Sequence, residues 1–463
     1  MLLTKLWRFL LVPAVFSPTA LAQTATDATW ASFADNGAAM PSPDLAVGPA
    51  HVVATVAGEL GWFSKATGQR MGGLAFDALW PWVIAPQDAR YARAIYNATT
   101  DRYYVAALWR DGADEYVALA VSDAGGVDDS WFVRRDRVNM PNTATDYISI
   151  GVSGDGLYVS FDYSTGAGSW ALWYTNDTMF NPAAYPGVGQ ASDEARRFAA
   201  NAASGAGDGR MILTAADSGS ISRVRINGRH DSQSWPWSHT VCDIPWQSDP
   251  PAGFGTRDFQ ASCIVGESLW LTHTITNDNR AVVRWYEINL NGWPNSGQAV
   301  ALEQHGSIDT GANTYTPAIA ADAGGNAVIV CSSTGHAVIR AVRFPGDPTG
   351  EFRPPVVLAT SSAPVPADWG AFYSIDADPT SPGVFWSHTA TMGSTGWQAH
   401  LTRTTIAAAP IYNPLYDLNG DGAIDTADAT IMIIAMGTNN PVCDLNNDGV
   451  VDTSDLAILI GEM

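Results

Sequence analysis

The sequence predicts an all-β fold followed by a short, mainly helical module at the C-terminal end. Composition is the first of three observations that support this fold class. The 463-residue chain contains 43 Gly, 27 Pro and 18 Trp, and Gly and Pro interrupt helices whereas aromatic residues suit pleated sheets. Apolar residues make up 46 % of the chain and charged residues only 15 %, which is enough apolar material for a folded core. The other two observations are a repeated strand pattern and an acidic C-terminal segment.

Charge separates the chain into two parts. The chain carries 46 acidic and 24 basic side chains, a formal net charge of -22. This balance argues against nucleic acid as a partner, because nucleic-acid binding depends on clustered Lys and Arg. Residues 416–463 hold nine of the acidic side chains and no Lys or Arg. We therefore expect one domain over 23–410 and a second over 411–463.

The first 22 residues have the pattern of a signal peptide. Lys5 and Arg8 stand before or within the start of a short apolar stretch, and the small residues of Ala20-Leu21-Ala22 suit a cleavage point after Ala22. Pro13 and Pro18 interrupt the stretch, and no other segment reaches the ~18 apolar residues that a membrane span needs. We therefore expect a secreted protein, extracellular or on the cell surface, without a membrane span.

The four cysteines are too few for a fold built on disulfides. Their spacings match no metal motif. Cys242 and Cys263 flank a Gly/Pro-rich loop, so a disulfide between them and two buried free thiols both remain open.

One strand pattern recurs seven times between residues 40 and 405. Each round has a short apolar strand, a turn, an alternating strand, a second turn and another alternating strand, and successive middle strands begin 52, 54, 53, 58, 58 and 57 residues apart. An antiparallel sheet repeated at this period is a propeller blade, which closes into a ring and so removes free edges. We predict a seven-bladed β-propeller over 23–410. A pair of β-sandwiches is the alternative, and the even spacing disfavours it.

The first strand of each round is expected to line the central channel, because small residues dominate it. These strands are 45–47, 91–96, 148–152, 198–202, 259–265, 318–322 and 371–376. The segments SPDLAVGPAHVV, RAIYNATTDRYYVAAL and DYISIGVSGDGLYVSF resemble parts of secreted bacterial propeller-like proteins of an uncharacterised family. This resemblance implies the fold and assigns no activity.

Polar residues recur just before or at the start of these inner strands, where a propeller presents its usual binding face. Carboxylates, guanidinium groups and aromatic rings together suit sugars, and two separated carboxylates can act as acid and base in glycoside hydrolysis. The alternative is structural pairing between the Asp and Arg side chains. A possible O-glycosyl hydrolase and a lectin-like binding protein therefore both remain open. The candidate catalytic residues are Asp88, Asp146 and Glu194; the substrate-binding candidates are Arg90, Tyr147, Arg197, Arg257, Asp258 and Trp369; and Asp44, Arg93 and Tyr373 stand at equivalent places.

Tryptophans fall into two groups. Trp109, Trp173 and Trp285 occupy alternating strand positions, where packing between blades is the expected role. Trp80 and Trp82 lie in a Pro-containing connection, and we expect them on the surface.

The acidic C-terminal segment contains two 12-residue repeats, DLNGDGAIDTAD (417–428) and DLNNDGVVDTSD (444–455). Oxygen ligands at positions 1, 3, 5, 9 and 12, a backbone carbonyl at position 7 and Gly at position 6 suit Ca²⁺. Four carboxylates in one loop repel each other without a cation, so calcium binding and folding are expected to be coupled. A solvated acidic linker is the alternative. The predicted ligands of two Ca²⁺ ions are Asp417, Asn419, Asp421, Ala423, Asp425 and Asp428, and Asp444, Asn446, Asp448, Val450, Asp452 and Asp455.

The surroundings of these EF-hand-like loops differ from those of an EF-hand. Pro414 and Pro441 each stand three residues before a loop and disrupt an entering helix, so only the exit segments, ADATIMIIAMG and SDLAILIGEM, are expected to be helical. A loop followed by a helix, present twice, resembles the type I dockerin. The resemblance implies binding to a cohesin module on a scaffold, with loop positions 10 and 11 as recognition residues: Thr426, Ala427, Thr453 and Ser454.

These observations lead to one functional prediction. We expect a secreted, calcium-binding, dockerin-bearing protein that takes part in extracellular polysaccharide binding or catabolism, because dockerins most often tether polysaccharide-degrading enzymes. The expected fold is a seven-bladed β-propeller followed by a small α-helical calcium-loop domain. The alternative is a non-enzymatic protein-interaction or cell-surface attachment protein with a structural propeller.

Overall fold

The computed structural model divides the chain into two compact units, one of which is residues 25–405 and the other of which contains the C-terminal residues from 406 on. The structure describes residues 24–460 except for 39–40, 129, 139–144, 154–155, 164–168, 182, 185, 191–196, 199, 202–209, 217–222, 231–237, 246–248, 250, 252–253, 255–258, 336, 364–372, 408–415, 417, 420–423, 425 and 447. Each unit is described separately below. Within the described residues, no helix is long and apolar enough to cross a membrane.

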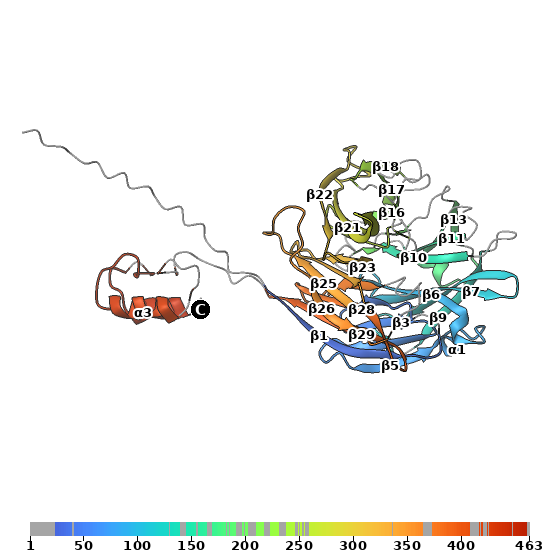
Figure 1. Ribbon diagram of the computed structural model, residues 1–463, viewed down its shortest axis with the longest axis horizontal. Helices are drawn as coiled ribbons and strands as arrows, with labels where there is room; N and C mark the ends of the chain where they lie inside the picture. The colour runs from blue at the N-terminus through green and yellow to red at the C-terminus, as the bar shows by residue number, and fades with distance from the viewer. Residues whose placement is uncertain are drawn as a thin grey trace, which may run out of the picture. The chain divides into compact units, whose positions relative to one another are not determined.

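The first unit is a β-propeller made of antiparallel sheets arranged around a central axis (Figure 1). In the first three sheets the strands run in chain order from the axis outward. Short helices occupy some connections: α1 (Phe76–Leu79), η1 (Pro86–Asp88) and α2 (Asn176–Met179). The strands are β2 (Asp44–Val47), β3 (His51–Val56), β4 (Glu59–Ser64) and β5 (Arg70–Ala75); β6 (Ala89–Asn97), β7 (Arg102–Asp111), β8 (Asp114–Ser122) and β9 (Trp131–Arg137); and β10 (Thr145–Ser153), β11 (Gly156–Tyr163), β12 (Ser169–Thr175) and β13 (Gly187–Gln190).

The later sheets continue around the axis in the same direction. The last sheet takes its outermost strand from the start of the chain. The strands are β14 (Arg197–Phe198), β16 (Arg210–Ala216), β17 (Arg223–His230) and β18 (Ser238–Asp243); β15 (Ala200–Asn201), β19 (Ala261–Val265), β20 (Ser268–Asn277), β21 (Arg280–Asn289) and β22 (Ala301–Ile308); β23 (Thr314–Ala321), β24 (Ala327–Ser333), β25 (Ala337–Arg343) and β26 (Val356–Thr360); and β27 (Ser374–Ala377), β28 (Val384–Gly393), β29 (Gly396–Ile406) and β1 (Ala25–Ala34).

The all-β propeller is confirmed, but the prediction of seven blades is wrong. Six sheets have an inner strand of four or more residues, whereas the sheet that contains β16–β18 has an inner strand, β14, of 2 residues. The chain then leaves this sheet, because β15 pairs in parallel with β19 of the next one. The predicted inner strand 198–202 is therefore divided between two sheets. The described residues form six complete blades and one reduced sheet.

Strand β1 closes the ring by lying beside β29 (Figure 1). A cluster of apolar side chains supports this junction, and its members come from the first and the last sheets: Phe33, Leu45, Val52, Phe63, Trp386 and Leu401 are among them. The Thr29 and Thr402 hydroxyls hydrogen-bond at 2.9 Å. Sheet pairing and apolar burial therefore join residues from the two ends of the propeller.

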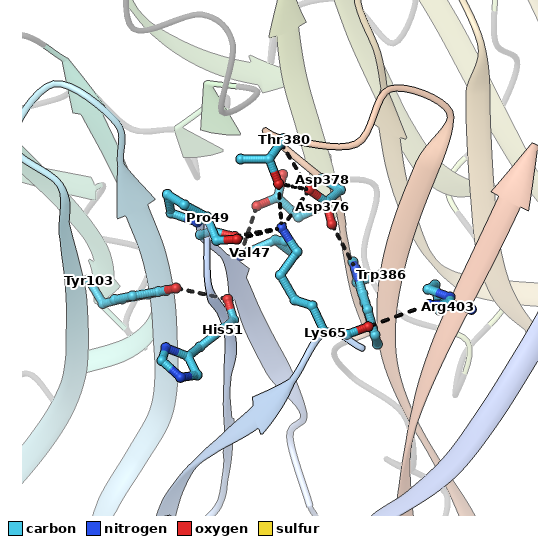
Figure 2. A network of polar contacts seen from close by, with 11 residues as sticks. Val47, Pro49, His51, Lys65, Tyr103, Asp376, Asp378, Thr380, Trp386 and Arg403 are labelled. Atoms are coloured by element: carbon cyan, nitrogen blue, oxygen red, sulfur yellow. Dashed lines mark hydrogen bonds and ion pairs between the residues drawn. The ribbon is translucent and has the colours of Figure 1, made fainter. Parts of the chain in front are cut away.

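A polar cluster joins the same two sheets at the turn between their first and second strands (Figure 2). The ammonium of Lys65 donates to the carboxylate of Asp378 at 2.7 Å, to the Thr380 hydroxyl at 2.8 Å, and to two backbone carbonyls of the first sheet, Gly48 and Pro49, at 3.0 and 3.1 Å. Asp378 also accepts from the Trp386 indole at 3.2 Å. Both charged groups are largely buried, so each depends on the other for compensation.

The second unit contains two helices, α3 (Thr426–Ala435) and α4 (Thr453–Ile460). Their buried sides meet in a small core that includes Met432, Val451 and Leu459. Each helix begins at position 10 of a 12-residue loop. The helices therefore form where the sequence predicts them, on the exit side of each loop.

All four cysteines are buried free thiols. Burial raises the pKa of Cys242 to about 11 and that of Cys263 to about 12, so both stay protonated at neutral pH. The structure therefore has two free thiols at Cys242 and Cys263 rather than a disulfide between them.

Candidate functional site

A cavity of about 110 Å³ lies on the propeller axis. Small apolar residues of β23, Ala318 to Ala321, form one part of its wall. The other inner strands and the residues beside them contribute both apolar residues, such as Leu45, Ile150 and Ile375, and polar ones: Asp44, Arg93, Tyr147, Ser149, Gln260, Ser262, Tyr373, Ser374 and Asp376. The cavity wall therefore mixes apolar and hydrogen-bonding residues.

Three inner strands carry the same distortion near their first residues. Tyr91, Tyr147 and Thr316 have positive φ values of 55°, 39° and 55°, and the register of each strand shifts at that point. Bulky and β-branched residues rarely adopt this conformation. The bulges change which side chains face the axis, and one bulged residue, Tyr147, lines the cavity.

Arg93 connects three successive sheets beside the cavity. Its guanidinium donates to the Ile148 carbonyl at 3.1 Å, stacks on the Tyr147 ring at 5.2 Å from the ring centre, and lies 3.9 Å from the Asp44 carboxylate. Asp44 also accepts from the Ala94 amide at 2.9 Å. Burial raises the pKa of Asp44, and the positive charge of Arg93 acts in the opposite direction.

Asp376 lies in the same cavity without a cationic neighbour. Among the described residues no Lys, Arg or His nitrogen lies within ion-pair distance of its carboxylate, which accepts a backbone hydrogen bond from Val47 at 3.3 Å (Figure 2). Burial raises the pKa of Asp376 to about 7, and the negative charges of Asp378 and Asp44 contribute in the same direction. This carboxyl group is therefore only partly ionised at neutral pH.

Three of the predicted sugar-site residues have described side chains, and these three lie in different surroundings. Tyr147 lines the cavity, whereas Arg90 pairs with Glu115 at 3.1 Å. Asp88 is exposed at the end of η1 and does not line the cavity. Nothing is described of the side chains of the other candidates: Asp146, Glu194, Arg197, Arg257, Asp258 and Trp369.

Five polar residues of the cavity wall were not among the predicted site residues: Ser149, Gln260, Ser262, Ser374 and Asp376. Gln260 and Asp376 lie within the predicted inner strands rather than at their starts, so a search of strand starts passes over them. A carboxylate in a strand of otherwise small and apolar residues is the signal that points to Asp376. The prediction that Trp80 lies on the surface is wrong. Its side chain is fully buried, and its indole nitrogen donates to the Leu119 carbonyl at 3.0 Å.

In the second 12-residue loop, the first and last Asp side chains accept hydrogen bonds from backbone amides of the same loop. Asp455 at position 12 is buried and accepts from the amides of Leu445, Asn446 and Asp452 at 2.8, 3.1 and 2.8 Å. Asp444 at position 1 accepts from the amides at positions 5 and 6 at 3.0 and 2.8 Å. Backbone and side chains therefore hold position 12 against the start of the loop.

The first loop repeats this arrangement where it is described. Buried Asp428 accepts from the amides of Leu418 and Asn419 at 2.8 and 3.2 Å, which are the positions that Leu445 and Asn446 hold in the second loop. The remaining predicted ligands of the first loop, Asp417, Asp421, Ala423 and Asp425, lie outside the described residues. The two loops are therefore structurally equivalent at position 12.

The donor types of the second loop fit a hard cation. Carboxylate and amide oxygens at positions 1, 3, 5, 9 and 12 are the ligands that Ca²⁺ prefers. In the part of the chain that the structure describes, no three His, Cys, Asp or Glu side chains already converge at ligand distance. Asp444, Asp448 and Asp452 each accept a hydrogen bond from a backbone amide of the loop or of the start of α4.

Comparison with protein families identifies the second unit. Residues 415–463 match the model of the dockerin type I domain, and these residues form such a domain. Dockerin domains bind cohesin modules, and type I dockerins bind calcium. No curated protein matches the chain.

Solved structures resemble the propeller only distantly. The Kluyveromyces lactis Hsv2 structure has a TM-score of 0.41 and 9 % identity, covering 78 % of this chain and 98 % of the other. The WD40 domain of SCAP from fission yeast has a TM-score of 0.39 and 8 % identity, covering 83 % and 99 %. Extracellular domains 1-2 of Drosophila Semaphorin 1b have a TM-score of 0.42 and 12 % identity, covering 84 % and 88 %.

Proposed function

We propose that this protein is a subunit of an extracellular assembly, attached through its dockerin domain to a cohesin module. The dockerin match at residues 415–463 carries the proposal. Two equivalent loops support the binding of two Ca²⁺ ions, one in each loop. When bound, calcium supplies positive charge that offsets the crowded carboxylates and links the two ends of each loop.

The recognition surface in this proposal is the first turn of each helix. Thr426 and Ala427 begin α3, Thr453 and Ser454 begin α4, and all four residues are exposed. The buried position-12 carboxylate of each loop follows directly, so calcium binding fixes the helix start. The two repeats differ at one recognition position, Ala427 against Ser454, and we expect either repeat to be able to contact a cohesin.

A binding assay with the full-length protein tests this attachment. We expect it to bind at least one cohesin from a panel of immobilised cohesin modules in calcium buffer and to dissociate in excess EGTA. Thr426→Arg and Thr453→Arg together should abolish binding, whereas each substitution alone should weaken it. Thr360→Arg, at an exposed position on the propeller, is the matched control. Equal binding with and without calcium would contradict the proposal.

For the propeller we propose polysaccharide binding. The assay described below also tests catabolism, which is the breakdown of the bound polysaccharide. The mixed polar and apolar wall of the axial cavity supports a sugar ligand. Protein binding alone, with a purely structural propeller, is the competing function. Pull-down on insoluble polysaccharides, followed by measurement of released reducing sugar, separates these functions: retention without release supports binding, and retention on no polysaccharide supports the structural alternative.

A further inference from the structure

Three carboxylates lie near the propeller axis where the first and last sheets meet. Two of them have a basic partner: Asp44 lies 3.9 Å from Arg93, and Asp378 lies 2.7 Å from Lys65. Asp376, which interacts with both of the other carboxylates, has only backbone amides as described partners (Figure 2). Of the three carboxylates, Asp376 is therefore the one without a basic partner among the described residues.

Asp376, the carboxylate without a described basic partner, lines the open cavity. Asp44, Arg93 and Asp376 are the charged residues of the cavity wall, so ionisation of both carboxyl groups leaves the cavity with one excess negative charge. Its volume of about 110 Å³ is several times the ~10–15 Å³ that a cavity needs to hold a single water, so it has room for a small ligand.

The neutral part of the wall restricts the ligand further. Ser149, Ser262 and Ser374 line the cavity, and so do apolar residues of several inner strands, among them Ala94, Ala261 and Ala318. Hydroxyls both donate and accept hydrogen bonds. A ligand with several hydroxyl groups and an apolar ring face matches this combination better than a bare ammonium ion does.

We propose that the axial cavity binds an amino sugar, with the ammonium group of a 2-amino-2-deoxyhexose against Asp376 and its hydroxyls against Asp44 and the cavity serines. This inference rests on the polysaccharide-binding part of the proposed function and names its ligand class. It does not depend on cohesin binding. A uronic acid would add a third negative charge to the cavity, and a neutral hexose would leave the excess charge unpaired.

Titration calorimetry on the full-length protein at pH 7.5 tests the proposal with four small probes. We expect D-glucosamine to bind, D-glucose to bind at least about tenfold more weakly, because it lacks the charged donor, and D-glucuronate not to bind. Ethanolamine presents an amine without the ring, and it should also bind at least about tenfold more weakly than D-glucosamine.

Two variants locate the binding. Asp376→Asn removes the charge but keeps a carbonyl oxygen that can accept from Val47, and it should weaken D-glucosamine binding at least about tenfold. Ser374→Ala removes one hydroxyl and should weaken it by a smaller factor. Asp278→Asn makes the same charge change at an exposed hairpin residue with a φ of 47°, a conformation that Asn tolerates, and should leave binding unchanged.

Several outcomes would overturn the proposal. These are absence of D-glucosamine binding, equal binding of D-glucose or ethanolamine, and unchanged binding by folded Asp376→Asn and Ser374→Ala. The pull-down assay keeps the two proposals distinguishable. Retention on neutral polysaccharides without D-glucosamine binding would support polysaccharide recognition but reject the axial amino-sugar site, whereas loss of both would reject both.

Discussion

At the scale of single residues, two buried titratable groups are expected to change the free energy of unfolding with pH in opposite directions. The pKa of Asp376 is raised to about 7, so the folded state holds its proton more tightly than the unfolded state does. Its contribution therefore falls as pH rises from about 4 to about 7. Burial lowers the pKa of His388 to about 3, so its contribution is lost as pH falls from about 6.5 towards 3.

We predict that Asp376→Asn removes the first of these dependences. Asn cannot ionise, so the difference in Tm between variant and wild type should grow in favour of the variant as pH rises from 4.5 to 8. Differential scanning calorimetry across this range measures the effect. Asp278→Asn is the control for a change of net charge, and a pH-independent difference for Asp376→Asn would show that the cavity carboxyl is not the titrating group.

At the scale of elements, three sheets share a pairing of tryptophan with glycine. Trp62, Trp173 and Trp285 on the third strand each face a glycine of the outer strand: Gly72, Gly187 and Gly306. A Cβ on any of these glycines would overlap the indole ring opposite. The outer strand therefore lies directly under the ring, which explains why these tryptophans act in packing.

We predict that Gly306→Ala destabilises the propeller by about 1–3 kcal/mol, the usual cost of overpacking. The new Cβ would overlap the Gly350 carbonyl and approach the Trp285 indole nitrogen. Gly346→Ala is the matched control, because its Cβ would meet nothing within 4 Å. Guanidinium unfolding of both variants measures the difference in the free energy of unfolding. Equal stability of the two variants would contradict this account of the pairing.

Most strands could be predicted because their signals lie in the local sequence. The strands that the prediction missed depend on pairing with residues far away in the sequence. The alternating segments and their spacing indicate the propeller, and the loop spacing indicates where α3 and α4 begin. Strand β1 has no such signal, because its neighbour β29 lies far away in sequence: Thr29 and Thr402 are 373 positions apart. The divided inner strand at 197–201 depends likewise on pairing with β19.

Candidate site residues were predictable to the extent that their roles depend on nearby sequence. Asp428 and Asp455 hold equivalent places because the 12-residue spacing fixes them. Asp376 depends on residues from other sheets, and Arg90 turns to Glu115 rather than to the axis. Trp80 lies in a Pro-containing segment that suggests exposure, but packing of α1 against the second sheet buries it.

At the scale of the whole molecule, ring closure depends on the ion pair of Lys65 with Asp378. We predict that Lys65→Met lowers the free energy of unfolding by about 3–5 kcal/mol, because it leaves the Asp378 carboxylate buried without its cation. Arg137→Met is the matched control: its pair with Asp114 is largely exposed, with 60 % of the Arg137 side chain accessible, and such pairs contribute about 1 kcal/mol or less.

Guanidinium unfolding at constant pH compares these two variants. A large loss for Lys65→Met with little change for Arg137→Met is the expected result. Similar small losses for both would mean that apolar burial and the β1 strand close the ring without help from the ion pair.

The position of β29 also determines how the propeller responds to mechanical load. The chain continues from Ile406 towards the dockerin domain, so tension applied through the dockerin domain would enter the propeller at this 11-residue strand. Because β29 lies between β28 and β1, a pull along its axis shears two hydrogen-bonded ladders at once. An edge strand in the same place would have only one ladder to resist the pull. The first strand of the propeller thus reinforces the strand through which force enters it.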